Sequence, residues 1–133
     1  MSQQIGHHAE QLIADYLVQQ GLELIAQNYH SRYGEIDVIV RDGNTLCFIE
    51  VKARRLKAQV GASESVNRSK QRKTIKTAQF FLQKHPQFED LFCRFDVFTL
   101  EYSSVESFNQ TTILISDQTH IHWEWIQDAY QLE

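Results

Sequence analysis

Apolar side chains recur at helical spacing near the start of the chain and at strand-like spacing in the segments that follow. Residues 3–20 carry an apolar stripe with a period near 3.6, and Gly21 follows it, which predicts a helix with a glycine stop. Residues 22–28 predict a short strand. Two strongly apolar segments, 34–40 and 46–52, flank a polar turn signal, so we expect them to form a β-hairpin.

The remainder of the chain passes again from helix to strand. The second helix is expected to bury a stripe of Ile75, Ala78 and Leu82, which Gln71 extends backwards, and to end before Pro86. The order α-β-β-β-α-β predicts a single α/β domain over residues 1–133, with a C-terminal strand and helix extension. The expected elements are a loop over 56–67, a helix over 67–85, a strand over 94–102, a closing hairpin of 111–116 and 120–125, and a short last helix over 126–130.

Acidic side chains interrupt both strands of the expected hairpin. A tight loop at 43–44 places Asp37 directly opposite Glu50, whereas a loop at 42–43 places Glu35 there instead. Either register brings carboxylates to within roughly 5 Å of each other at Cβ, which destabilises a sheet unless something compensates. A divalent cation would compensate, so this pair of strands predicts a site.

Charge is distributed very unevenly along the chain. The net charge of −4 argues at first against nucleic acid, but nine of the 13 lysines and arginines lie between Lys52 and Lys76, opposed only by Glu64. Lys52 shares a strand face with Glu50, so this basic block begins at the expected site. We interpret the block as a phosphate-binding surface rather than a solvated helix face joined to a charged loop. Its candidate nucleic-acid contacts are Arg54, Arg55, Lys70, Gln71, Arg72 and Lys73.

Length and composition indicate an ordinary globular protein. A chain of 133 residues, 42% hydrophobic and 23% charged, can bury the core of one domain. No run approaches the roughly 18 apolar residues of a membrane span, and the start lacks a signal-peptide core, so we expect a cytoplasmic protein. Cys47 and Cys93 lie in apolar runs and are interpreted as buried thiols rather than as a disulfide.

Several short motifs occur together in an order that known proteins share. They are Gly6…Ala9-Glu10, Gly34-Glu35-Ile36-Asp37, Phe48-Ile49-Glu50-Val51-Lys52-Ala53-Arg54, Lys70-Gln71, Ala78 before Phe81-Leu82, Arg94-Phe95-Asp96-Val97, and Trp125-Ile126…Ala129-Tyr130. With these motifs the chain resembles, almost end to end, the YraN family of bacterial proteins. More broadly it resembles the PD-(D/E)XK nuclease superfamily, which includes restriction endonucleases and Holliday-junction resolvases. The resemblance implies a restriction-endonuclease-like core with a mixed central sheet flanked by helices.

The resemblance also implies a set of roles. Asp37 and Glu50 would hold Mg²⁺ or Mn²⁺, with the Val51 carbonyl as a further ligand. Glu10 would complete the acidic cluster from the first helix, and Lys52 would orient or activate the attacking water. The implied activity is metal-dependent endonucleolytic hydrolysis of DNA, on branched or single-stranded substrates, and the resolvase-like members suggest a homodimer. Ile36 stands where the superfamily's name has proline, a residue that carries no chemistry.

Other interpretations of the same residues stay open. The chain could keep a nuclease fold and bind nucleic acid without cleaving it. It could instead be an adaptor that recruits a partner through Trp123, Trp125 and Tyr130, although alternating apolar side chains here are more typical of a core. Lys70 would bind a phosphate or simply face solvent.

Two pairs of histidines and one pair of charged side chains raise smaller questions. His7-His8 and His120-x-His122 could suggest a metal site, but we expect structural or solvent-facing histidines because no third ligand has clear spacing. Arg94 and Asp96 are expected to support the sheet rather than the chemistry.

Overall fold

A computed structural model describes residues 2–55, 68–102 and 121–130. Five strands form one sheet in the order β1-β2-β3-β4-β5, in which β3 and β4 are parallel and the other neighbours are antiparallel. The predicted α/β class with a mixed sheet is confirmed, and the arrangement is consistent with a restriction-endonuclease-like core. The elements are α1 (Ser2–Gln19), β1 (Glu23–Ser31), β2 (Gly34–Asp42), β3 (Thr45–Arg55), α2 (Arg68–Lys84), the 3₁₀ turn η1 (Pro86–Phe88), β4 (Phe92–Tyr102) and β5 (Ile121–Tyr130).

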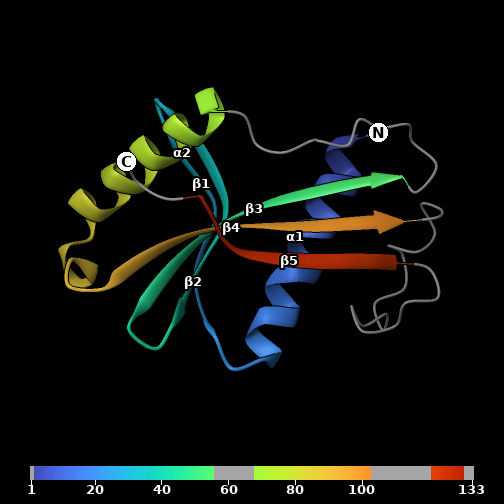
Figure 1. The fold of residues 1–133 in the computed structure, drawn as a ribbon, viewed down its shortest axis with the longest axis horizontal. Helices are drawn as coiled ribbons and strands as arrows, with labels where there is room; N and C mark the ends of the chain where they lie inside the picture. The colour runs from blue at the N-terminus through green and yellow to red at the C-terminus, as the bar shows by residue number, and fades with distance from the viewer. Residues whose placement is uncertain (1, 56–67, 103–120, 131–133) are drawn as a thin grey trace.

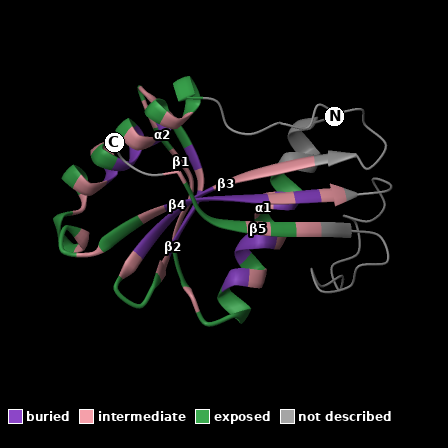
Figure 2. Ribbon diagram, in the orientation of Figure 1, coloured by how far each residue is buried: buried purple, intermediate pink, exposed green. Residues whose placement is uncertain are grey.

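The two helices pack on opposite faces of the strongly twisted sheet (Figure 1). On one face α1 meets side chains of β2, β3 and β4, and on the other α2 meets a second cluster rich in phenylalanine. Buried positions therefore run along the middle strands and the inner sides of both helices (Figure 2). Burial of these two apolar layers is the main stabilising contribution to the fold.

The first helix forms where the apolar stripe predicts it. Ala9, Ile13 and Leu17 recur every four residues and are fully buried. The helix ends because Gly21 adopts a left-handed conformation with φ 95°, which a side chain would disfavour. The amide of Leu22 then donates to the Leu17 carbonyl at 3.1 Å, so an otherwise unpaired helix-end carbonyl is satisfied.

The second helix is also confirmed, but its buried stripe is shifted from the predicted one. Thr74, Thr77, Ala78 and Phe81 are buried, whereas Ile75 and Leu82 are only partly buried and pack at the edge of the cluster. The predicted stripe contained no threonine because an unpaired hydroxyl is costly to bury. Thr77 can enter the core because its hydroxyl donates to the Lys73 carbonyl at 2.9 Å and meets the Ser31 hydroxyl at 3.0 Å.

The β2–β3 hairpin adopts one of the two predicted registers. Its two-residue loop is Gly43-Asn44, since Asp42 pairs with Thr45, and Gly43 takes the positive φ of 63° that such a turn needs. The ladder then continues to the pair Val38 and Ile49. One step further, this register sets Asp37 opposite Glu50.

The predicted last helix over 126–130 is wrong, because β5 continues as a strand to Tyr130. Pairing with β4 overrides the local helical pattern. The strand passes an irregularity in the pairing between Phe95 and Val97, where Asp128 takes φ 54° and donates its amide to Asp96 at 2.9 Å. A long-range contact that the local sequence does not reveal therefore fixes this conformation.

Three further expectations are resolved or set aside by the structure. Both cysteines are free, as expected, but only Cys47 is buried; Cys93 is exposed near the start of β4. Within the described residues, no helix is long and apolar enough to cross a membrane. The expected loop over 56–67 and the expected strand over 111–116 lie outside the described residues.

Candidate active site

Strands β2 and β3 part at one end of their ladder and form a fork. Their pairing stops at Val38 and Ile49; beyond it β2 continues beside β1, and β3 continues beside β4 as far as Arg55. Asp37 and Glu50 are the first residues past the last pair, so they lie at the base of the fork. A hydrogen bond spans it, since the Val51 amide donates to the Asp37 carboxylate at 2.8 Å.

The alternation of side chains along β2 breaks at this point. Val38 packs with the α1 layer as alternation predicts, but Ile36 packs with the α2 layer, although two residues apart they should share a face. Opposite the break on β1 lies Asn28, which has a left-handed φ of 52°. Asp37 therefore sits where the strand changes faces, and its carboxylate can be approached from both helices.

Two glutamates from other elements approach Asp37 near the fork. Glu10, from α1, lies within hydrogen-bonding reach of both Asp37 and the Asn28 side chain. Glu50 comes from β3 and shares the parity of Leu46 and Phe48, which places it on the α2 side. Asp37 therefore has one of the predicted glutamates, Glu10 or Glu50, on each side.

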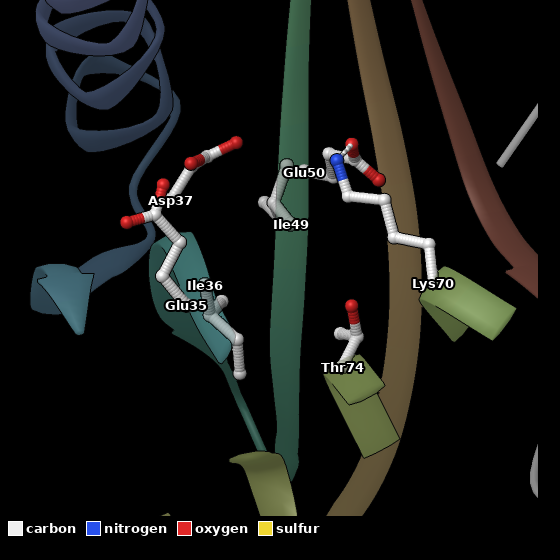
Figure 3. A pocket seen from close by; sticks show the side chains of 7 residues that line it. All are labelled: Glu35, Ile36, Asp37, Ile49, Glu50, Lys70 and Thr74. Atoms are coloured by element: carbon white, nitrogen blue, oxygen red, sulfur yellow. Dashed lines mark ion pairs between the residues drawn. The ribbon is translucent and has the colours of Figure 1, made fainter. Parts of the chain in front are cut away.

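A pocket opens over the fork on the α2 side (Figure 3). Lys70 reaches from the first turn of α2 to Glu50, with its ammonium 2.5 Å from the carboxylate, and Thr74 lies one turn further along the helix. Glu35 lines the same pocket and also pairs with His30 at 3.2 Å. The pocket lining comprises Glu35, Ile36, Asp37, Ile49, Glu50, Lys70 and Thr74.

The local electrostatics favour a proton on Asp37. Burial raises the pKa of this carboxyl to about 7, and the neighbouring charges of Glu10, Glu50 and Glu35 act in the same direction. The hydrogen bond from the Val51 amide opposes the shift but does not cancel it. A titratable group shifted by burial and by specific neighbours, in a pocket, is typical of a functional site.

The neighbours of Asp37 respond to the same environment. Burial raises the pKa of Glu10, assisted by the charge of Glu35 and partly opposed by contacts with Asp37 and Asn28. Partial burial disfavours the charged form of Lys70, but the hydrogen bond and charge of Glu50 outweigh it and raise the pKa of Lys70. The site is therefore rich in carboxylates, and Lys70 supplies a positive charge beside one of them, Glu50.

The donor chemistry fits a hard divalent cation. One oxygen of Glu10 and one of Glu50 are buried without a hydrogen-bond partner among the described groups, so each has a lone pair to offer. Carboxylate oxygens are the ligands that Mg²⁺ and Mn²⁺ prefer. Within residues 2–55, 68–102 and 121–130, however, no three acidic, histidine or cysteine side chains are grouped as a metal site needs. The Lys70 ammonium instead occupies the place beside Glu50.

The other predicted site residues are distributed around this pocket. Lys52 is half-buried and follows Glu50 by one strand step, as expected. Arg72 and Lys73 are exposed on α2, and Gln71 is half-buried. The side chains of Arg54 and Arg55 lie outside the described residues, and the structure gives Val51 an amide contact with Asp37 without testing its carbonyl as a ligand.

Sequence reasoning did not identify three residues at the site. Asn28 and Thr74 are described above, and Tyr130 hydrogen-bonds Thr74, while burial raises the pKa of Tyr130 to about 12. Asparagine tolerates left-handed backbone better than most residues, so Asn28 at the end of an apolar run carried a weak signal. Thr74 and Tyr130 carried no such signal, because α2 and β5 are far apart in the sequence and only the fold brings these two side chains together.

The adaptor interpretation is not supported by the packing of its aromatic residues. Trp123 and Trp125 stack on Phe98 with ring centroids 5.6 and 5.9 Å away, and Tyr130 stacks on Phe95 at 5.2 Å. These rings join the two core layers rather than presenting one shared surface.

Comparison with known proteins identifies the family. A family model described as "Uncharacterised protein family UPF0102" matches residues 9–100, a span that contains the fork and α2. A UPF0102 protein of Acinetobacter baumannii (strain AYE) is 42% identical over 133 residues, covering 100% of this chain and 98% of that protein. A UPF0102 protein of Psychrobacter sp. (strain PRwf-1) is 41% identical and covers 96% of this chain and 88% of its own length. One from Acinetobacter baylyi is 38% identical over 128 residues, with 96% and 90% covered. The chain belongs to the UPF0102 family.

Proposed function

We propose that this protein is a divalent-metal-dependent endonuclease that hydrolyses phosphodiester bonds in DNA. The observation that carries the proposal is that two glutamates approach Asp37 at the base of a fork in the sheet, Glu10 from α1 and Glu50 from β3. Neighbouring carboxylates destabilise a fold unless a cation or hydrogen-bond donors compensate them, and here one buried oxygen of Glu10 and one of Glu50 have no hydrogen-bond partner among the described groups. A cation bound at that point would relieve both problems.

Cations beside the carboxylates support a phosphate-bearing substrate. Lys70, Lys73 and Lys76 follow each other at intervals of three along α2; Arg68 precedes them, and Arg72 lies between the first two. A helix that brings positive side chains to an acidic pocket suits a polyanion whose phosphate reaches the carboxylates through a bound metal. Lysine near the helix start opposes the helix dipole, which is a small cost that an anionic ligand would offset.

The chain's own groups would divide the work. Asp37, Glu50 and Glu10 would hold Mg²⁺ or Mn²⁺, which when bound supplies positive charge at the phosphate and acidity to a water molecule. The Val51 amide keeps the Asp37 carboxylate in position. Lys52 would orient the attacking water, and Lys70 would exchange Glu50 for a phosphate oxygen as the substrate enters. We place the protein in the cytoplasm, a reducing compartment in which its two cysteines would stay free.

The direct test is incubation of the purified protein with plasmid, forked, four-way-junction and single-stranded DNA, with Mg²⁺, with Mn²⁺ and with a chelator. We expect cleavage of at least one substrate that depends on the metal. Asp37→Asn should reduce it by roughly 100-fold or more, because loss of a ligand or transition-state contact usually has that effect.

A matched control lies on the same strand. Asp42→Asn makes the same chemical change at the closed end of the hairpin, where the side chain is exposed, and should cleave like wild type. If wild type and Asp37→Asn both bind DNA and neither yields product with any metal, the nuclease proposal fails. The chain would then be a nucleic-acid-binding protein that retains a nuclease fold.

A further inference from the structure

The short turn between β1 and β2 carries an aromatic ring surrounded by cations. Tyr33 receives a hydrogen bond to its hydroxyl from the Arg32 guanidinium at 3.0 Å. The guanidinium carbon lies 5.1 Å from the ring centroid, and the Lys76 ammonium, from α2, lies 5.7 Å from it. The hydrogen bond and charge of Arg32 lower the pKa of Tyr33.

The turn is held firmly against α2. The Ser31 hydroxyl meets the Thr77 hydroxyl at 3.0 Å and accepts the Tyr33 amide at 3.0 Å. At Gly34 a side chain would come within 3.7 Å of Lys73 and Thr77, so strand and helix approach closely there. The position of the Tyr33 ring is therefore set by the fold rather than by a free loop.

Burial does not explain this tyrosine. Among the described residues, the two core clusters and the side chains packed against them do not include Tyr33. Its nearest aromatic counterpart on β1, Tyr29, packs edge-on against Phe81 in the α2 layer at 5.0 Å. Tyr33 is instead half-buried, and two cations lie near its ring.

A row of lysines connects this ring to the carboxylate pocket. Residues three apart are neighbours on a helix surface, so Lys70, Lys73 and Lys76 form a continuous positive ridge about 9 Å long. One end of the ridge contacts Glu50 and the other contacts Tyr33. Glu35, two residues after Tyr33, lines the pocket itself.

We propose that Tyr33 is a stacking platform for an unpaired base of the substrate, and that the ridge of lysines carries the backbone from that base to the site. Proteins bind single strands by stacking bases on aromatic side chains while nearby cations hold the phosphates, and Tyr33 with its two neighbouring cations offers both kinds of contact. Paired bases within a duplex cannot offer a free face. The substrate class is therefore DNA with an unpaired stretch beside the cleavage point. This inference rests on the proposed function for the reaction, but its test uses binding alone.

The test is a binding cycle in a chelator, so that no cleavage is needed. Fluorescence anisotropy would measure the affinity of wild type and Tyr33→Ala for an oligothymidylate of about 20 nucleotides, and for the same strand with a run of bases removed and every phosphate kept. We expect removal of the bases to weaken wild type by roughly 5- to 100-fold. Tyr33→Ala should lose a similar factor on the intact strand and almost none on the abasic one.

Matched variants separate stacking from charge and from folding. Tyr33→Phe keeps the ring and should bind within about twofold of wild type, while Tyr33→Leu keeps the bulk without an aromatic face and should behave like alanine. Phe92→Ala removes an exposed aromatic ring at the first residue of β4, away from the lysine ridge, and should leave the affinity for both strands unchanged. Lys76→Gln should weaken intact and abasic strands alike, unlike Lys84→Gln at the other end of α2.

The proposal is overturned if Tyr33→Ala weakens binding of the abasic strand by the same factor as binding of the intact strand. It is also overturned if wild type binds the intact and abasic strands equally, or if Tyr33→Ala weakens duplex as much as single strand. A coupled effect in the absence of any cleavage would support the platform while the nuclease proposal fails, so the two can be told apart.

Discussion

Two aspartates in this sheet differ in the groups that surround them. Asp96 on β4 is fully buried and is satisfied within the chain, because it accepts hydrogen bonds from the Arg94 guanidinium, the Trp125 indole and the Asp128 amide. Asp37 on β2 accepts the Val51 amide, and its other charged neighbours are mainly carboxylates. The first aspartate is satisfied by donors from its own sheet, whereas the second lies near three carboxylates whose charges raise its pKa.

This difference supports the proposed assignment of Asp96 to the fold and of Asp37 to a metal site, without reference to any motif. Asp96 is fully buried and Asp37 only partly, but the exposure of a side chain does not reveal its role. The supply of donors does: a structural carboxylate is surrounded by groups that hydrogen-bond to its charged form, and a ligand carboxylate is surrounded by groups that do not. Four predictions test the contrast, in order of decreasing effect.

Removing Asp96 should have the largest effect on stability. Asp96→Ala leaves the Arg94 guanidinium without its carboxylate and frees the bulge at Asp128, so we expect a loss of about 3–5 kcal/mol in the free energy of unfolding. Asp37→Ala should cost far less or stabilise the protein. Urea denaturation of both variants at pH 8 measures the difference, and equal losses would abolish the distinction drawn above.

The stability of the wild-type protein should depend on pH through Asp37. The folded pKa of about 7 lies above the ordinary value of 3.8, so the folded state holds this proton more tightly than the unfolded chain. Stability from this group is therefore present below about pH 4, declines as pH rises to about 7, and stays lost above it. Compared with Asp37→Asn, wild type should lose up to about 4 kcal/mol over that range. Parallel pH curves for the two proteins would contradict the assignment.

A divalent metal bound at Asp37, and not at Asp96, should stabilise the folded protein. Mn²⁺ at a hundredfold excess over its dissociation constant should raise the free energy of unfolding by about 2.7 kcal/mol. Asp37→Asn and Glu50→Gln should lose the effect, while Asp42→Asn keeps it. Because the metal competes with a proton on Asp37, affinity should fall below pH 7, which calorimetric titration at several pH values would show. Stabilisation that persists in both site variants would place the metal elsewhere.

The smallest effect is expected from Lys70. Its ion pair with Glu50 is more than half exposed on the lysine side, so Lys70→Gln should change stability by only about 0–1 kcal/mol. The same change should strengthen Mn²⁺ binding, because a competing cation is removed from Glu50, and weaken binding of DNA. Weaker metal binding in this variant would mean that Lys70 holds Glu50 in place for the metal rather than competing with it.

The sequence was most informative where local chemistry decides the structure. The hairpin register could be reduced to two choices because only two tight loops were compatible with Gly43, and each choice brought carboxylates together. The expectation that Arg94 and Asp96 support the sheet is likewise borne out by their hydrogen bonds. These outcomes depend on neighbours close in sequence or on simple alternation.

Contacts between distant segments account for what was missed. The strand character of residues 126–130 comes from pairing with β4 and from the Asp128–Asp96 bond, across 32 positions. The break in alternation at Asp37 depends on the packing of Ile36 against α2, which no periodicity in β2 reveals. The Lys70–Glu50 pair was missed for the same reason, because the sequence predicts the helix and the strand but not how close they lie to each other.

The hydrogen bond across the fork also makes the main chain an indicator of the site's ionisation. The Val51 amide donates a hydrogen bond to the Asp37 carboxylate, with the nitrogen 2.8 Å from the oxygen, so the magnetic environment of the amide proton changes whenever that carboxylate gains a proton or a metal. A single backbone resonance, in a uniformly nitrogen-labelled sample, would therefore follow the state of the carboxylate cluster through a titration. The fold has placed a spectroscopic reporter beside its most unusual side chain.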